Sequence, residues 1–207
     1  MKYGADSESK DNVGKTPLHY NHCITCLYII IKEQNTRKDE EKDKMWNILD
    51  LQDNKGNTCL MQAILDLKET TAKLNLVKEI VKWNADFSIQ NNKGKNALML
   101  AAEHCNSDIL GMIIMKMLND ELENKVIVRD KLKSEAIMKL KNNQEEDVLT
   151  IAIMARSKEW ISILIDIANF TIEKSHVKNA KEYLQNNSKL YGFIKKRYQS
   201  QESKYIR

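Results

Sequence analysis

The sequence predicts an all-helical protein made of a repeated unit, and two observations carry this prediction. The 207 residues include one proline and six glycines, so few residues interrupt a helix. A short motif also recurs along the chain: a polar pair, one further residue, a glycine, and a leucine four residues after that glycine. Recurrence of this kind predicts a stack of similar units in which each contacts its neighbours.

The motif occurs three times with its glycine and once without it. The copies are DNVGKTPLHY from Asp11, DNKGNTCLMQA from Asp53, NNKGKNALMLAA from Asn91 and NNQEEDVLTIA from Asn142. The three glycines are separated by 42 and 38 residues, and Glu145 takes the place of glycine in the fourth copy. Residues 2–14 also align without a gap on residues 82–94, which supports the same register.

Each motif predicts a tight turn followed by a helix. The motif glycines stand where such a turn needs positive φ, which glycine adopts at little cost. Thr16 and Thr58 can cap the following helix, and Pro17 fits its first turn, where the missing N–H costs nothing. A leucine then begins each buried stripe: Leu18, Leu60, Leu98 and Leu149.

Apolar segments predict a second helix in every unit, at residues 24–31, 76–83, 108–118 and 159–167. Extra residues near 67–75 predict a longer link between the two helices of the second unit. The insertion at 32–44 is highly charged, which is typical of a solvated loop or a helix extension. The insertion at 119–141 contains apolar residues and is compatible with an extra helix.

The residues after Phe170 lose the motif but keep helical spacing. Apolar residues recur in two runs separated by QNNS, which predicts one or two capping helices: Val177, Ala180 and Leu184, then Leu190, Tyr191, Ile194 and Tyr198. Residues 173–207 hold nine of the 33 basic and three of the 29 acidic residues, a net charge of +6. The basic character of the chain therefore belongs to its tail, for which we expect a basic outer face.

These motifs resemble the ankyrin repeat, whose pattern is a turn, D-x-x-G-x-T-P-L-H-x-A, two antiparallel helices and G-A-D. The resemblance covers roughly residues 2–170 and implies an all-α ankyrin-repeat solenoid. It implies an array over residues 1–172 followed by a basic helical cap or tail at 173–207. The implied repeats lie near 11–50, 51–90, 91–141 and 142–172. The opening KYGAD resembles the exit of a preceding repeat, so we expect a fragment of a longer array or a shortened paralogue.

The resemblance implies a non-enzymatic scaffold that binds another protein through its turn tips and concave face. The implied contact residues are Asn12, Val13, Lys15, Tyr20, Asn54, Lys55, Asn57, Gln62, Asn92, Lys93, Lys95 and Leu100. We expect Lys15, Lys55 and Lys93 to line one edge of the stack and to attract an acidic partner. We expect an intracellular location, in the cytoplasm or nucleus.

Two further interpretations stay open. The half-repeat at the start is compatible with the ankyrin segment of a larger channel or signalling protein. The divergent repeats, together with 28 lysines against five arginines, are compatible with an effector that an intracellular parasite, symbiont or virus directs into host cytoplasm. For the basic tail, a solvated cap is favoured over a site for nucleic acid or anionic membrane.

The sequence predicts neither catalysis nor a cofactor. It contains no nucleophile elbow, phosphate-binding loop, dinucleotide fingerprint or H-E-x-x-H motif, and no small-molecule substrate is expected. Four metal-ligand types fall within eight residues: His19, His22, Cys23 and Cys26. One helix cannot close a tetrahedron with them, so we predict no metal site, and the resemblance implies that His19 bonds to neighbouring turns. Cys59 and Cys105 are predicted to be buried packing residues.

Overall fold

The structure is a computed structural model of the chain. It describes residues 6–20, 24–35, 48–66, 71–83, 85–104, 107–123, 129–168 and 170–205. These residues form helices and turns and no strand, so the predicted all-α class is confirmed for the described part of the chain. The chain divides into two compact units, Met1–Leu100 and Ala101–Arg207 (hereafter unit 1 and unit 2), and the division falls within one helix. The predicted division at residue 172 stays a prediction.

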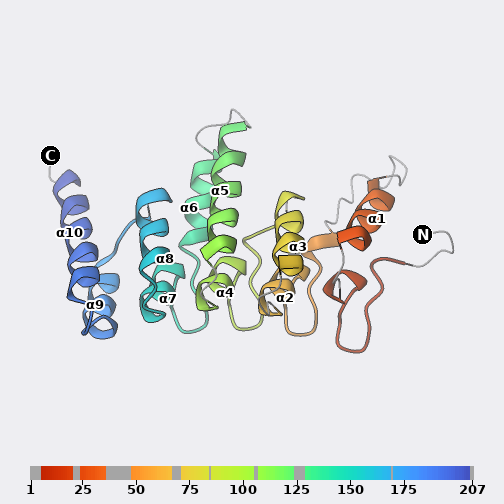
Figure 1. The fold of residues 1–207 in the computed structure, drawn as a ribbon, viewed down its shortest axis with the longest axis horizontal. Helices are drawn as coiled ribbons and strands as arrows, with labels where there is room; N and C mark the ends of the chain where they lie inside the picture. The colour runs from red at the N-terminus through yellow and green to blue at the C-terminus, as the bar shows by residue number, and fades with distance from the viewer. Residues whose placement is uncertain are drawn as a thin grey trace. The chain divides into compact units, whose positions relative to one another are not determined.

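Unit 1 contains short helices connected by tight turns (Figure 1). Its elements are η1 (Pro17–Tyr20), α1 (Ile24–Asn35), η3 (Ile48–Asp50), α2 (Cys59–Leu65), α3 (Thr71–Lys82) and the first part of α4 (Ala97–Glu103). Thr58 begins α2 as predicted, because its hydroxyl accepts a hydrogen bond from Met61 N. The predicted cap Thr16 makes a different contact, because its hydroxyl oxygen lies 2.9 Å from Nδ1 of His19.

The core of unit 1 is built from the predicted leucines and from the second helices. Helix α2 packs against η1, η3 and α3, and α3 also packs against α1. The innermost residues are at most 4% exposed: Leu18, Leu27, Leu60, Ile64, Leu76, Val77, Ile80 and Leu98. First helices therefore contact first helices and second helices contact second helices, the arrangement expected of stacked units.

Unit 2 contains the two longest described helices, of 17 and 18 residues, together with shorter ones. Its elements are the rest of α4, α5 (Ser107–Glu123), α6 (Arg129–Met138), α7 (Val148–Met154), α8 (Lys158–Ser162), the π-helical η4 (Ile163–Ile167), α9 (Lys174–Tyr183) and α10 (Ser188–Tyr205). Asp147 and Ser157 cap α7 and α8 by accepting hydrogen bonds from Thr150 N and Trp160 N. Helix α5 packs against α6 and α8, and α7 packs against α8 and α9. Leu149 and Trp160 are almost fully buried in this core.

Several expectations about the connections can now be judged. The four predicted second helices are present as α1, α3, α5 and the continuous α8–η4 segment. The longer link predicted in the second unit is present, because α2 ends at Leu65 and α3 begins at Thr71, whereas α4 ends at Glu103 and α5 begins at Ser107. It ends before residue 75, since α3 includes residues 71–75. The extra helix at 119–141 is present as α6, and the two tail helices as α9 and α10. Of the insertion at 32–44, the first residues end α1, and residues 36–44 lie outside the described residues.

No described helix combines the length and the apolar character that crossing a membrane requires.

Candidate functional site

The candidate site is the row of tight turns that precede the first helices. We number them turn 1 (residues 11–15), turn 2 (53–57), turn 3 (91–95) and turn 4 (142–146). In turn 1 the carboxylate Oδ1 of Asp11 accepts the backbone N–H groups of Val13 and Lys15, at 2.9 and 2.8 Å. Asp11 N also donates to Lys15 O, so the turn is closed as a short hairpin.

All four turns share this hydrogen-bond pattern. In turns 2 to 4 the first residue accepts from the third and fifth N–H groups at 2.8–3.0 Å: Asp53, Asn91 and Asn142. The fourth residue has φ of 75°, 75°, 72° and 62° in turns 1 to 4, so Glu145 adopts the backbone conformation of the glycines. The side chain of the first residue therefore defines the turn. In the sequence its only sign was the recurring polar pair.

Turns 1, 2 and 3 are joined edge to edge within unit 1. Asn54 N donates to Val13 O, and Asn92 N donates to Lys55 O, both at 3.0 Å. The side chain of Asn54 adds a hydrogen bond to Asn12 O, and that of Asn92 adds one to Asn54 O. The turn tips are thus linked to one another, and the asparagine side chains take part in the links.

The residue directly before each of these turns takes part in a second set of links between them. Lys10 Nζ donates to Gln52 O at 2.7 Å, and Gln52 Nε2 donates to Gln90 O at 3.0 Å. Gln52 Nε2 also donates to Gly56 O within its own turn. Because each brace reaches the equivalent residue of the next turn, the spacing of the tips is fixed by local contacts.

His19 holds turn 1 against turn 2. Its Nδ1 accepts from Thr16 N at 3.1 Å, and its Nε2 therefore carries the proton that it donates to Asn57 O at 2.9 Å. Burial lowers the pKa of His19 below its usual 6.5, although the bond to Asn57 O opposes this shift. The expected bond from His19 to a neighbouring turn is present, and the second bond, from Thr16 N to Nδ1, requires a neutral ring.

The predicted contact residues fall into three groups. Seven are exposed: Asn12, Val13, Tyr20, Asn54, Lys55, Asn92 and Lys93. Three are half-buried: Lys15, Gln62 and Lys95. Asn57 and Leu100 are each only 3% exposed, so their assignment to the contact surface is wrong. Asn57 is enclosed because its side-chain oxygen accepts from Asn91 and its backbone oxygen from His19, and Leu100 belongs to the apolar face of α4.

The expected row of three lysines also needs correction. Lys55 and Lys93 are the third residues of their turns, whereas Lys15 is the fifth residue of turn 1. The residue of turn 1 that corresponds to Lys55 and Lys93 is Val13, which is 46% exposed. The row at the third position therefore reads apolar, basic, basic.

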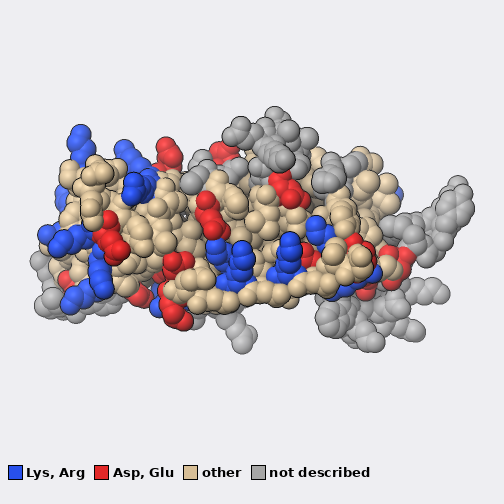
Figure 2. All heavy atoms as spheres, turned by 90° about the horizontal axis from the view of Figure 1, so that it is seen from below, with Lys and Arg blue, Asp and Glu red and all other residues tan. Residues whose placement is uncertain are grey.

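The ammonium groups of this region differ in their surroundings. Lys15 Nζ lies 5.0 Å from the ring centre of Tyr20, whose hydroxyl donates to Asp11 at 2.6 Å. Within the described residues, Lys55 and Lys93 make no ion pair or side-chain hydrogen bond through their ammonium groups. Figure 2, which views the molecule from the side of the turns, shows lysine side chains gathered over this part of unit 1.

An exposed aromatic pair, which the sequence pattern did not indicate, is formed by one residue of α1 and the residue directly after α3. Tyr28 and Trp83 meet edge to face with ring centres 6.2 Å apart, and Tyr28 donates to Glu79 at 2.6 Å. Glu79 also pairs with Lys82 at 2.6 Å. The polar atoms of this cluster thus bond to one another.

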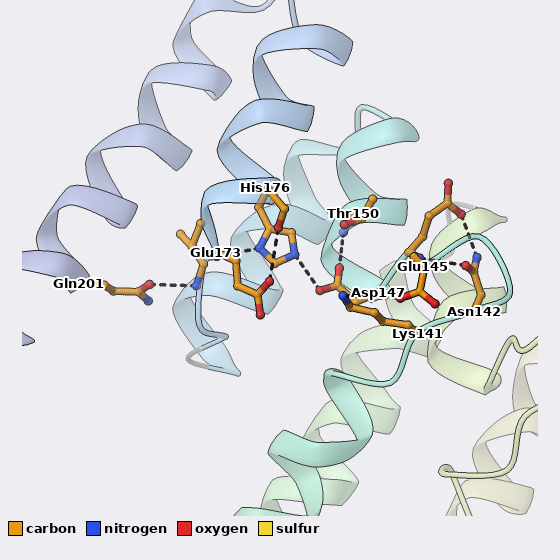
Figure 3. A network of polar contacts seen from close by, with 11 residues as sticks. Lys141, Asn142, Glu145, Asp147, Thr150, Glu173, His176 and Gln201 are labelled. Atoms are coloured by element: carbon orange, nitrogen blue, oxygen red, sulfur yellow. Dashed lines mark hydrogen bonds and ion pairs between the residues drawn. The ribbon is translucent and has the colours of Figure 1, made fainter.

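A buried polar network joins α7 and α9 within unit 2 (Figure 3). His176 Nδ1 accepts from Glu173 N at 2.8 Å, and its Nε2 donates to Asp147 Oδ2 at 2.7 Å. Burial opposes ionisation of Asp147, but the bond from His176 and the N–H of Thr150 prevail and lower the pKa of Asp147. His176 binds the N–H three residues before it just as His19 binds Thr16 N. The sequence around His176 does not repeat the motif around His19, so it did not indicate this similarity.

The tail helices present basic side chains to solvent. Lys174, Lys178 and Lys181 of α9 are exposed, and their spacing of four and three residues places them on one side of the helix. Arg197 of α10 pairs with Asp166 and lies over the ring of Phe193, with 5.6 Å between the guanidinium carbon and the ring centre. The predicted basic outer face is therefore present on α9.

Within the described part of the chain, no group of three potential metal ligands occurs. Cys26 is exposed. Cys59 is buried as predicted, and burial raises the pKa of its thiol to about 12, so it is an inert packing residue. His22, Cys23 and Cys105 lie outside the described residues.

No protein-family model matches the chain, and no curated protein is similar to it above the level of chance.

Proposed function

We propose that this chain is an ankyrin-repeat scaffold without enzymatic activity, and that it binds an acidic surface of another protein through turns 1 to 3. The observation that carries the proposal is the pair Lys55 and Lys93. They occupy the same position in two hydrogen-bonded turns, and their ammonium groups have no partner among the described residues. Such charges attract a complementary surface and set partner choice.

The ankyrin assignment rests on agreement between sequence and local geometry. Four turns share one hydrogen-bond pattern and one positive φ, and each is followed by a buried leucine. The bond from Glu173 N to His176 extends this likeness to the helix pair α9–α10, which we assign as a further, divergent repeat. A braced stack of this kind supports binding because the backbone of its turns loses little freedom when a partner docks.

The proposed surface consists of the accessible members of the predicted set. The exposed members are Asn12, Val13, Tyr20, Asn54, Lys55, Asn92 and Lys93, with Lys15, Gln62 and Lys95 half-buried beside them. Asn54 and Asn92 also hold the turns together, so their substitution would mix stability with binding. Lys55 and Lys93 are the residues whose charge can be changed with least structural consequence.

A second candidate surface is the lysine face of α9. Three exposed lysines on one side of a helix attract any closely spaced set of negative charges. No exposed large hydrophobic side chain belongs to the described part of the tail, so this face offers electrostatic attraction alone. The two candidate surfaces therefore differ in which charge-reversal variant should lose binding of the partner.

Affinity capture with three charge-reversal variants tests the proposal. We expect the Lys55→Glu/Lys93→Glu variant to lose partners that the wild type retains, and the Lys32→Glu/Lys78→Glu variant to keep them. The latter is the matched control, because Lys32 of α1 and Lys78 of α3 are both exposed and the change in charge is equal. Loss of the partners only in Lys174→Glu/Lys178→Glu/Lys181→Glu would assign binding to the tail and overturn the proposal.

A further inference from the structure

The third position of turns 1 to 3 forms a regular row of side chains. Val13, Lys55 and Lys93 occupy this position in successive turns, and all three are exposed. Backbone hydrogen bonds of 3.0 Å join turn 1 to turn 2 and turn 2 to turn 3. The row therefore presents one apolar and two basic groups in a fixed order.

The spacing of this row follows from its hydrogen bonds. Each turn is a closed hairpin, because its first N–H donates to the carbonyl of its fifth residue. Each turn thus contributes two adjacent chain segments. Hydrogen-bonded segments lie about 4.8 Å apart, which gives about 10 Å from one turn to the next. Packed helix layers are about 8–10 Å apart, which agrees with this value.

Resting on the proposed function, we propose that the row binds an acidic segment of the partner in the polyproline II conformation, with acidic residues three positions apart. A polyproline II chain repeats every three residues and rises about 3.1 Å per residue, so every third side chain lies on one edge about 9.3 Å apart. Two carboxylates at this spacing meet Lys55 and Lys93. An apolar residue three positions further meets Val13.

Other backbone conformations fit the row less well. In an extended strand, side chains on one face are about 6.7 or 13.4 Å apart, and neither distance matches about 10 Å. An α-helix places residues seven apart at about 10.5 Å, but a docking helix buries an apolar stripe. The row offers one apolar side chain, Val13, in three positions. A solvated polyproline II chain needs no such stripe.

Binding of isomeric peptides tests this inference directly. Fluorescein-labelled LPPEPPE carries the proposed spacing, and LPPPEPE and LPEPPPE have the same composition with glutamates two and four apart. The reversed sequence EPPEPPL covers the opposite chain direction. We expect LPPEPPE or EPPEPPL to bind at least about fivefold more tightly than either isomer, with affinity that falls as salt rises, because exposed charge pairs are screened.

Variants of the protein separate the possible outcomes. The spacing preference should vanish in Lys55→Glu/Lys93→Glu and persist in Lys32→Glu/Lys78→Glu. The single variant Lys55→Glu should bind LPPKPPE more tightly than LPPEPPE. Binding that needs Lys55 and Lys93 but ignores spacing, or equally tight binding of a helical peptide with glutamates seven apart, would overturn the polyproline II inference and leave the proposed function standing. Unchanged peptide binding by Lys55→Glu/Lys93→Glu would overturn both.

Discussion

Turn 2 and turn 4 have the same hydrogen bonds but different residues at the position with positive φ. Turn 2 has Gly56 with φ of 75°, and turn 4 has Glu145 with φ of 62°. A Cβ atom on Gly56 would lie 2.6 Å from Asn92 Oδ1 and 2.7 Å from Asn92 N, whereas the Glu145 side chain is 84% exposed. Turn 2 therefore needs glycine for space as well as for φ, and turn 4 tolerates a side chain.

The largest expected effect separates these two requirements. We expect Gly56→Ala to cost about 3 kcal/mol of unfolding free energy, because a left-handed alanine and a clash with backbone of the next turn add together. Chemical denaturation followed by circular dichroism measures the loss. Gly192→Ala is the matched control, because this exposed residue lies within α10 and an added Cβ meets nothing within 4 Å. That control should gain up to about 1 kcal/mol from helix propensity. Equal effects of the two substitutions would contradict the close approach of turns 2 and 3.

The next effect tests what the two turns share. Asp53→Ala and Asn142→Ala should each cost about 2 kcal/mol, because each removes an oxygen that accepts two backbone N–H groups. Comparable losses measured by chemical denaturation would support one turn architecture in both units. Asp53→Asn keeps the accepting oxygen, as Asn91 and Asn142 do naturally, and should lose much less. A loss at Asp53 with none at Asn142 would mean that the side-chain oxygen does not hold turn 4.

A smaller effect of opposite sign is expected at turn 4. Glu145→Gly should gain about 1 kcal/mol, because it relieves the left-handed strain of a residue with a side chain. The substitution also removes the 3.9 Å contact with Lys141, but both side chains are largely exposed and such pairs contribute little. Gln144→Gly is the control, because Gln144 is also exposed but is not among the residues with positive φ. This substitution should be destabilising. A loss of stability in Glu145→Gly would show that Glu145 contributes a contact that outweighs its strain.

Periodicity explains which parts of the molecule could be predicted from the sequence. The motif glycines, the motif leucines and the second helices follow from recurring positions, and the structure places them as expected. Turn 4 lacks the motif glycine, but Asn142 keeps the oxygen that accepts the two backbone N–H groups of the turn.

The errors arose where a side chain has a local polar partner. Asn57 was assigned to the surface as a polar turn residue, but hydrogen bonds from His19 and Asn91 enclose it. The likeness of His176 to His19 lies in a hydrogen bond to the N–H three residues earlier, and the letters of the tail do not repeat. Lys15 lies at a turn tip like Lys55 and Lys93, and only the hydrogen-bond register separates it from them.

The smallest expected effect concerns pH and compares the buried histidine of unit 1 with the buried carboxylate of unit 2. Burial holds the pKa of His19 below 6.5, so folding favours its neutral form. Its contribution is complete above pH 6.5 and is lost as the pH falls through the lowered value. The lowered pKa of Asp147 acts in the same direction but only below its usual 3.8.

Between pH 7 and 5 the wild type should therefore lose stability that a His19→Gln variant does not lose, although that variant is less stable at pH 7. Protonation of His19 at Nδ1 would set its new N–H against Thr16 N–H, so the hydrogen bond from Thr16 N to Nδ1 cannot survive it. Denaturation midpoints measured every half pH unit test this difference. Parallel slopes for the wild type and His19→Gln would show that His19 is not the group that titrates in this window.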